Sequence, residues 1–168
     1  MDIERIVAQV LDNVQNGAMT QKEAPLQQIK SISLKVAKAL IELVEAEAKR
    51  MGVNAVIAVS NAGANPVAVH CMDDSYIASF DVAFQKAYTV VALKMSTMTL
   101  KGLSQPGGAL YGIQHTNQGR IVIFGGGEPL EVDGVVIGGL GVSGGSEEQD
   151  AALAAYGKNK LKEVIAWL

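Results

Sequence analysis

The stretch that decides the fold is residues 125–150, which read GGGEPLEVDGVVIGGLGVSGGSEEQD. Two apolar strand candidates, 129–132 and 135–142, flank the dipeptide Asp133-Gly134, whose two positions both tolerate positive φ. This pattern predicts a β-hairpin. Ser146 then opens a capping box (S-x-x-Q), which predicts a helix from this residue to the end of the chain. A hairpin followed by a helix favours an antiparallel sheet covered by helices.

The remaining elements precede this stretch. Apolar periodicity and turn clusters predict a helix at 33–51, strands at 55–59 and 67–72 joined as a hairpin, a helix at 77–95, a short helix at 109–115 and a strand at 120–124. With the strands of the deciding stretch, this order gives an α/β (α+β) fold. We expect a mainly antiparallel five-stranded sheet covered by helices.

Length and composition restrict the class of protein. The chain has 168 residues, of which 49% are apolar and 18% are charged, enough for the hydrophobic core of one domain. A net charge of −3 without a basic cluster argues against nucleic acid and anionic membranes as partners. We find neither a secretory signal pattern nor an apolar run that could cross a bilayer. Together with a single cysteine, Cys71, these features predict a cytoplasmic protein.

Glycine is the unusual residue, because 14 of the 18 glycines lie between Gly102 and Gly145. The run 139–144 matches the dinucleotide pattern GxGxxG, but the chain ends before the second strand that such a unit requires. We therefore expect these glycines to allow close packing. Glycine elsewhere in the cluster lets the backbone itself line a ligand. The candidates for such a ligand-binding surface are Gly107, Gly108, Gly125, Gly126 and Gly127.

Lys86 is the most informative charged residue. On its predicted helix it lies in an apolar sector beside Val82, Ala83 and Val90. Because burying an unpaired ammonium group costs several kcal/mol, Lys86 needs a partner. Four roles are open: pairing with an acid, capping a strand carbonyl, reaching an interface, or holding an anionic ligand such as a propionate.

Metal-ligating residues are few. A structural zinc site needs more ligands than His70, His115 and Cys71 supply, and in a strand His70 and Cys71 would point to opposite faces. A haem iron needs only one axial side chain. His70 and His115 are therefore the candidate haem ligands, and a hydrogen-bonded structural role is the alternative for each. No catalytic triad or activated cysteine can be assembled from the sequence.

Several motifs occur in order and resemble the haem-binding GlcG/HbpS-like family. They are AVSNAGANPVA at 58–68, MDD at 72–74, KAYT at 86–89, GGEPL at 126–130, DGVVIG at 133–138, GVSG at 141–144 and EQD at 148–150. The resemblance covers about residues 30–166. It implies a profilin-like sandwich, assembly into symmetric homo-oligomers, and binding or degradation of haem.

Two further resemblances concern cobalamin-dependent pathways. The motifs HCMDD at 70–74 and PGG at 106–108 are similar to the C-terminal domain of PduO-type cobalamin adenosyltransferases. We recognise no catalytic adenosyltransferase domain in this sequence, so that activity is not expected. The amphipathic helix predicted at residues 3–14 resembles an encapsulation peptide of bacterial microcompartment cargo. The alternative is a helix that packs on its own domain or on a neighbour.

These observations define three parts and a favoured function. We expect an amphipathic N-terminal helix at 1–15, a linker at 16–26 and a GlcG/HbpS-like domain at 27–168. The favoured function is an oligomeric accessory protein that binds haem, another tetrapyrrole or a corrinoid, in the cytoplasm or the lumen of a microcompartment. Its partners would be shell or cargo proteins contacted through residues 3–14. The alternatives are an enzyme that uses Lys86 on a small carboxylate or aldehyde, and an assembly protein without a ligand.

Overall fold

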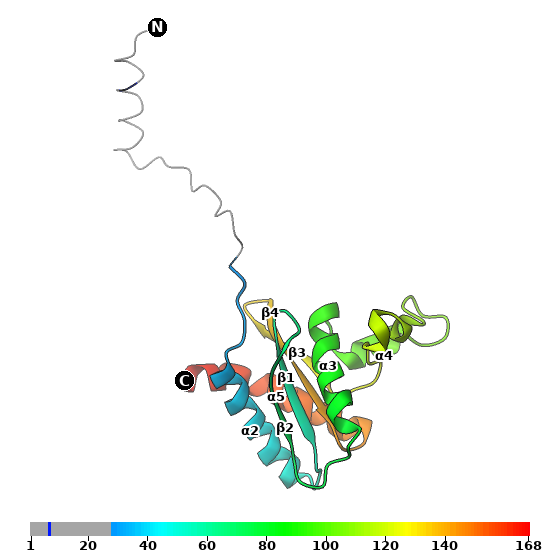
Figure 1. Cartoon of the computed structure of the whole chain (residues 1–168), viewed down its shortest axis with the longest axis horizontal. Coiled ribbons are helices and arrows are strands. Elements are labelled where there is room, and N and C mark those ends of the chain that lie inside the picture. Colours follow the sequence, from blue (N-terminus) through cyan, green and yellow to red (C-terminus); the bar gives the residue numbers. More distant parts are fainter. Residues whose placement is uncertain (1–6, 8–27) are drawn as a thin grey trace.

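The computed structural model describes residue 7 and residues 28–168. Four antiparallel strands form a sheet in the order β2-β1-β4-β3. The strands are β1 Val56–Asn61, β2 Pro66–Cys71, β3 Gly127–Val132 and β4 Val135–Ser143. Helices α2 (Leu34–Arg50) and α5 (Glu147–Trp167) pack on one face, and α3 (Ser79–Leu93) packs on the other, with α4 (Thr97–Leu103) beside it (Figure 1). The predicted α+β sandwich with an antiparallel sheet is therefore confirmed.

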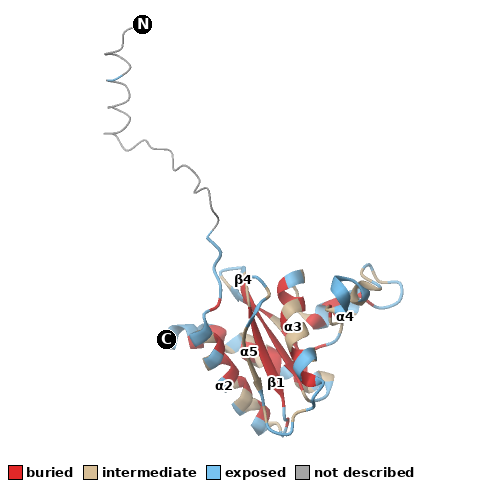
Figure 2. Cartoon of the chain, viewed as in Figure 1, coloured by how far each residue is buried: buried red, intermediate tan, exposed pale blue. Residues whose placement is uncertain are grey.

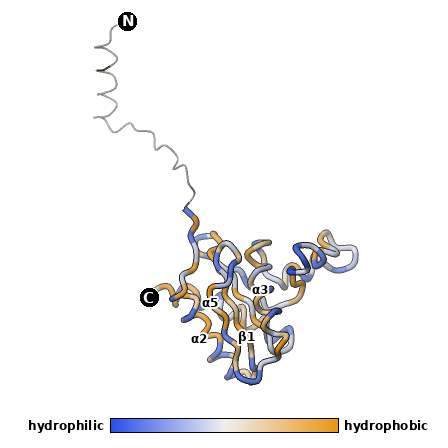
Figure 3. The backbone as a smooth tube through the Cα atoms, in the orientation of Figure 1, coloured by the Kyte–Doolittle hydropathy of each residue, from blue (hydrophilic) through white to orange (hydrophobic). Residues whose placement is uncertain are grey.

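The core follows from the alternation of side chains along β1. Ile57 and Val59 point to the side of α2 and α5, whereas Val56 and Ala58 point to α3. Figure 2 shows the buried residues along the strands and the inner faces of the helices, and hydrophobic residues gather along β1, α2 and the end of α5 in Figure 3. Both faces of the sheet are thus covered, which is why β1 is buried along almost its whole length.

The glycines of β4 bring α3 unusually close to the sheet. A Cβ atom on Gly141 would meet the carbonyl oxygen of Ala83, and one on Gly139 would meet that of Ala87. Neither position can therefore hold a larger residue without moving α3. The glycines of the GxGxxG run thus allow close packing, as expected from the sequence: Gly139 and Gly141 against α3, and Gly144 against the backbone of Asn54.

Turn and cap chemistry places the two hairpins and two of the helices as predicted. Asp133 and Gly134 have φ of 52° and 75° at the β3–β4 turn. The Ser146 hydroxyl accepts from the Gln149 N–H, completing the predicted capping box of α5, and the Ser33 hydroxyl accepts from the Val36 N–H at the start of α2. These signals lie within a few residues of the structure they determine.

The predicted strand at 120–124 is wrong, so the described part of the chain has four strands rather than five. This segment runs beside α3, where the Val122 N–H donates to the Thr89 hydroxyl at 3.0 Å. The hydroxyl hydrogen of Thr89 goes to the Gln85 carbonyl of its own helix at 2.8 Å, with the Arg120 carbonyl as a longer contact at 3.3 Å. A side chain of α3 thus satisfies the Val122 N–H, which a neighbouring strand would otherwise accept.

The predicted helix at 109–115 is also wrong, because only Ile113–His115 form a short 3-10 turn there. Gly112 adopts φ of 87°, which an α-helix cannot contain. The helix expected at 77–95 ends at Leu93, because Lys94 takes the left-handed conformation. Ser96 then caps α4, a helix that was not predicted.

Candidate functional site

Lys86 is fully buried and forms the centre of a polar cluster between α3 and α5. Its Nζ lies 2.9 Å from Oδ2 of Asp150 and 2.7 Å from the carbonyl oxygen of Val142. The same Nζ sits 4.9 Å from the centre of the Phe124 ring. Burial lowers the pKa of Lys86, and the Asp150 carboxylate opposes that shift. Two of the four roles left open by the sequence, pairing with an acid and capping a strand carbonyl, are therefore observed together.

The run Gly125–Gly127 lies directly against this cluster. A Cβ atom on Gly126 would come 2.6 Å from Lys86 Nζ, so this position leaves room for the ammonium group. The Gly125 N–H donates to Glu147 Oε1 at 2.7 Å, and the Gly127 N–H donates to the Thr97 hydroxyl at 2.9 Å. These backbone groups are thus held by the protein's own side chains, and contact of the three glycines with a ligand stays a prediction.

A cavity of about 310 Å³ adjoins the cluster, beside the start of α3 and the start of α5. Asp150 lines this cavity, whereas its partner Lys86 does not. The Glu147 carboxylate also lines it, and the Gly125 N–H together with Lys101 holds the pKa of that carboxyl below its usual range. The residues that line the cavity are Tyr76, Ala78, Ser79, Val82, Phe124, Ser143, Gly144, Gly145, Glu147 and Asp150.

His70 lies on the other side of the sheet. It sits on β2, an edge strand, and its Nδ1 lies 2.9 Å from Oε1 of Glu45 on α2. The His70 side chain is 35% exposed, so part of the ring is open to solvent. Cys71 is exposed, next to His70 at the end of β2. The structure thus gives His70 a carboxylate partner that no sequence spacing indicated.

His115, Gly107 and Gly108 lie in the segment that follows α4, at the opposite end of the molecule from α2 (Figure 1). His115 is exposed, and its Nε2 is 3.4 Å from the amide nitrogen of Gln114. Gly107 has φ of 83°, and a Cβ atom on Gly108 would meet the backbone of the preceding turn. The predicted ligand residues therefore fall into three places: the Lys86 cluster, the His70 edge and the segment after α4.

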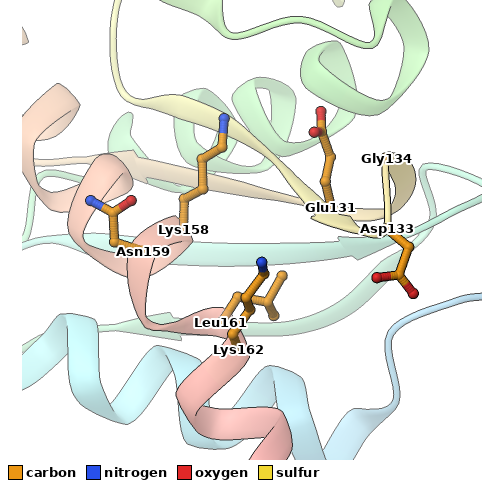
Figure 4. A pocket seen from close by; sticks show the side chains of 7 residues that line it. All are labelled: Glu131, Asp133, Gly134, Lys158, Asn159, Leu161 and Lys162. Atoms are coloured by element: carbon orange, nitrogen blue, oxygen red, sulfur yellow. The ribbon is translucent and has the colours of Figure 1, made fainter.

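A larger cavity, of about 450 Å³, lies between the β3–β4 turn and α5 and contains none of these residues (Figure 4). Its charged side chains, among them Glu131, Asp133 and Lys162, do not converge on one point in this view. In residue 7 and residues 28–168, no three acidic, histidine or cysteine side chains are arranged to hold a metal ion. No helix of that part is long and apolar enough to cross a membrane.

Sequence reasoning missed two features of these sites. It did not pair His70 with Glu45, because residues 25 positions apart meet only once β2 and α2 are packed. Asp150 belongs to the EQD motif at 148–150, but no local pattern identifies it as the partner of Lys86, which lies 64 residues earlier. The apolar sector around Lys86 was the available signal, since it required a buried acid nearby.

Comparison with known proteins shows which family the chain belongs to. Residues 32–158 match the model of the HbpS-like family, which is described as haem-degrading protein HbpS-like. The chain is 47% identical over 128 residues to the 15.0 kDa protein of the dhaT-dhaS intergenic region of Citrobacter freundii, covering 76% of this chain and 90% of that protein. It is 43% identical over 107 residues to the corrinoid adenosyltransferase PduO of Salmonella typhimurium, covering 64% of this chain and 32% of the relative. The chain thus spans about a third of PduO.

A solved structure supports the same family relationship. The PduOC:heme complex superposes with a TM-score of 0.74 and 37% sequence identity, covering 77% of this chain and 94% of that one. The resemblance predicted from the motifs is confirmed. With a family match over most of its length, a close relative and a matching fold, the chain belongs to the HbpS-like family of haem-degrading proteins.

Proposed function

We propose that this protein is a haem-binding accessory protein in which His70 is the axial ligand of the iron. Membership of a family described as haem-degrading and similarity to a domain solved with haem support the ligand. The observation that carries the site is the contact between His70 Nδ1 and the Glu45 carboxylate at 2.9 Å. Metal-binding histidines commonly donate their second ring nitrogen to a carboxylate in this way.

The contact with Glu45 fixes which nitrogen is free. An ionised carboxylate only accepts hydrogen bonds, so Nδ1 of a neutral His70 must carry the proton. The lone pair then lies on Nε2, the nitrogen that binds iron when imidazole is an axial ligand. The ring lies at a sheet edge and is 35% exposed, so it is not enclosed within the domain. The donor chemistry of His70 and Glu45 therefore fits haem, which would supply the redox-active iron.

His115 is the weaker of the two predicted ligands. It is exposed on a segment of turns and short 3-10 helices, and among the described residues its ring has only the Gln114 amide as a hydrogen-bonding neighbour, at 3.4 Å. A ligand on such a segment is less well oriented than one on a strand with a carboxylate partner. Lys86 is still less suited to a propionate, because it is buried and already has Asp150 and Val142 as partners.

Titration of the full-length protein with haemin tests the proposed ligand. We expect the Soret band of haemin to shift on binding and the shift to saturate at low micromolar concentration. A parallel titration with cobalamin separates haem from a corrinoid. No shift at micromolar haemin, with protein shown to be folded by circular dichroism, would refute haem binding.

We further propose that this role is carried out by a homo-oligomer in the cytoplasm or in the lumen of a bacterial microcompartment. Similarity to a corrinoid adenosyltransferase supports a cobalamin-dependent pathway. Residues 3–14, which lie almost entirely outside the described residues, supply the amphipathic pattern of an address for shell or cargo proteins.

Fluorescent fusions expressed with shell proteins test the address, and light scattering gives the oligomer mass. Val10→Glu would disrupt the apolar stripe and should disperse the fusion, while Gln9→Glu on the polar side should leave it with the shell. Equal localisation of the two variants would contradict the proposed address.

A further inference from the structure

We propose that the cavity at the starts of α3 and α5 binds a small neutral molecule with a hydroxyl group and an apolar portion. The cavity holds about 310 Å³, and no predicted haem ligand lines it. His70 lies on the side of the sheet covered by α2, whereas this cavity opens beside α3. The inference therefore goes beyond haem binding and can fail or succeed independently of it.

Two buried hydroxyl groups leave one hydrogen without an acceptor. Ser79 and Ser143 are only 6% and 8% exposed, and their oxygens lie 3.1 Å apart. One hydroxyl must donate to the other, which uses one of their two hydrogens. Among the described residues no acceptor for the second hydrogen is present, although both side chains line the cavity. A ligand oxygen in the cavity would supply that acceptor.

Two carboxylates on the same wall have unused acceptor capacity. Asp150 accepts from the Gly145 N–H and from Lys86, one hydrogen bond on each oxygen. Glu147 likewise accepts from the Gly125 N–H on one oxygen and from Lys101 on the other. Each carboxylate oxygen can accept two hydrogen bonds, so a ligand donor can be added to either residue.

The charges of the site select a neutral ligand. The Lys86 ammonium is buried between Asp150, Val142 and the Phe124 ring, so it is not available to an anion. An anion entering the cavity would instead face two carboxylates. A cation meets carboxylates that are already paired with Lys86 and Lys101, so neither sign of charge finds an unpaired partner of opposite sign in this lining. A hydroxyl group both accepts from a serine and donates to a carboxylate, which matches what the cavity offers.

Two aromatic side chains of the cavity account for the apolar portion of the ligand. Phe124 is 41% exposed and Tyr76 is 72% exposed, and both rings line the cavity. Such partly covered rings gain from contact with an apolar group. At about 30 Å³ for each water molecule, the volume suits a ligand of about ten non-hydrogen atoms. A lining of this kind, with aromatic rings and a few polar groups, is typical of small-molecule sites.

Ligand-observed saturation-transfer NMR with benzyl alcohol as the probe tests this inference on the full-length protein. We expect saturation transfer from the protein to benzyl alcohol, and at least fivefold weaker binding of benzoate, benzylamine and toluene at matched concentrations. Ser79→Ala and Phe124→Ala should each weaken benzyl alcohol binding about five- to tenfold, the effect of one lost hydrogen bond or ring contact.

Two control variants make the result decisive. Phe80→Ala removes an exposed ring from α3, the helix that also carries Ser79. Phe80 does not line the cavity, so this variant should leave benzyl alcohol binding unchanged. His70→Ala should also leave it unchanged, which separates this site from haem binding. Equal binding of the alcohol, the acid and the hydrocarbon, or an equal loss in Phe80→Ala and Phe124→Ala, would overturn the proposal.

Discussion

At the scale of single residues, the ion pair between Lys86 and Asp150 has the largest expected effect on stability. The sequence alone required a partner for Lys86, because an unpaired buried ammonium group is too costly. It could not name Asp150, because that choice depends on how α3 and α5 approach each other across the end of the sheet. The contact at 2.9 Å identifies the partner.

We predict that Lys86→Met destabilises the protein by roughly 3–5 kcal/mol, because it leaves the buried Asp150 carboxylate without its cation. Urea unfolding measures this free energy. Lys160→Met is the matched control, since Lys160 pairs with Glu163 at the surface, where water and salt screen the pair, and its loss should have little effect on stability. Similar losses in the two variants would show that the buried pair is not important for stability.

Glu147 gives a prediction for pH. Hydrogen bonds from Gly125 and Lys101 lower its pKa in the folded state, so its contribution to stability is present above the unfolded value and is lost as pH falls through the folded value. Glu147→Gln keeps an acceptor for Gly125 but loses the charge, and should cost about 1 kcal/mol at pH 7. In urea titrations at pH 7, 4 and 3, this difference should shrink toward zero with falling pH. A difference that grows in acid would contradict the assignment.

At the scale of elements, local signals were sufficient for the hairpins and caps but not for residues 120–124. Asp133-Gly134 and the capping box act within a few residues, so the sequence could specify them. The segment 120–124 has the apolar pattern of a strand, yet its Val122 N–H donates to the Thr89 side chain of α3 instead of to a neighbouring strand. The structure of this segment depends on a residue more than 30 positions away, so it cannot be predicted from local sequence.

The packing of α3 on β4 predicts opposite effects for two glycine substitutions. Gly141→Ala would force a methyl group against the Ala83 carbonyl and should cost more than about 3 kcal/mol, or prevent folding. Gly102→Ala, in α4, meets no atom within 4 Å and should be neutral or stabilising by up to about 1 kcal/mol. Thermal unfolding of the two proteins compares them directly, and equal melting temperatures would refute the close approach of α3.

At the scale of the whole molecule, the fold and the family could be predicted from the order of motifs, but the sites could not. Of the candidate side chains only His115 lies in the glycine-rich stretch, and the structure separates His70, Lys86 and His115 into three regions. The partner of His70 is fixed only when α2 packs beside the sheet edge, which no local pattern encodes. This is why the sequence left both histidines open, whereas the contact with Glu45 favours His70.

The measurement that tests the central claim most directly is a haemin titration of His70→Ala beside His115→Ala, followed by the Soret band. The account predicts that His115→Ala reproduces the spectrum and saturation of the unsubstituted protein, whereas His70→Ala loses the axial-ligand shift or binds haemin at least tenfold more weakly. Loss of the shift in His115→Ala with His70→Ala unaffected, or no change in either variant, would contradict it.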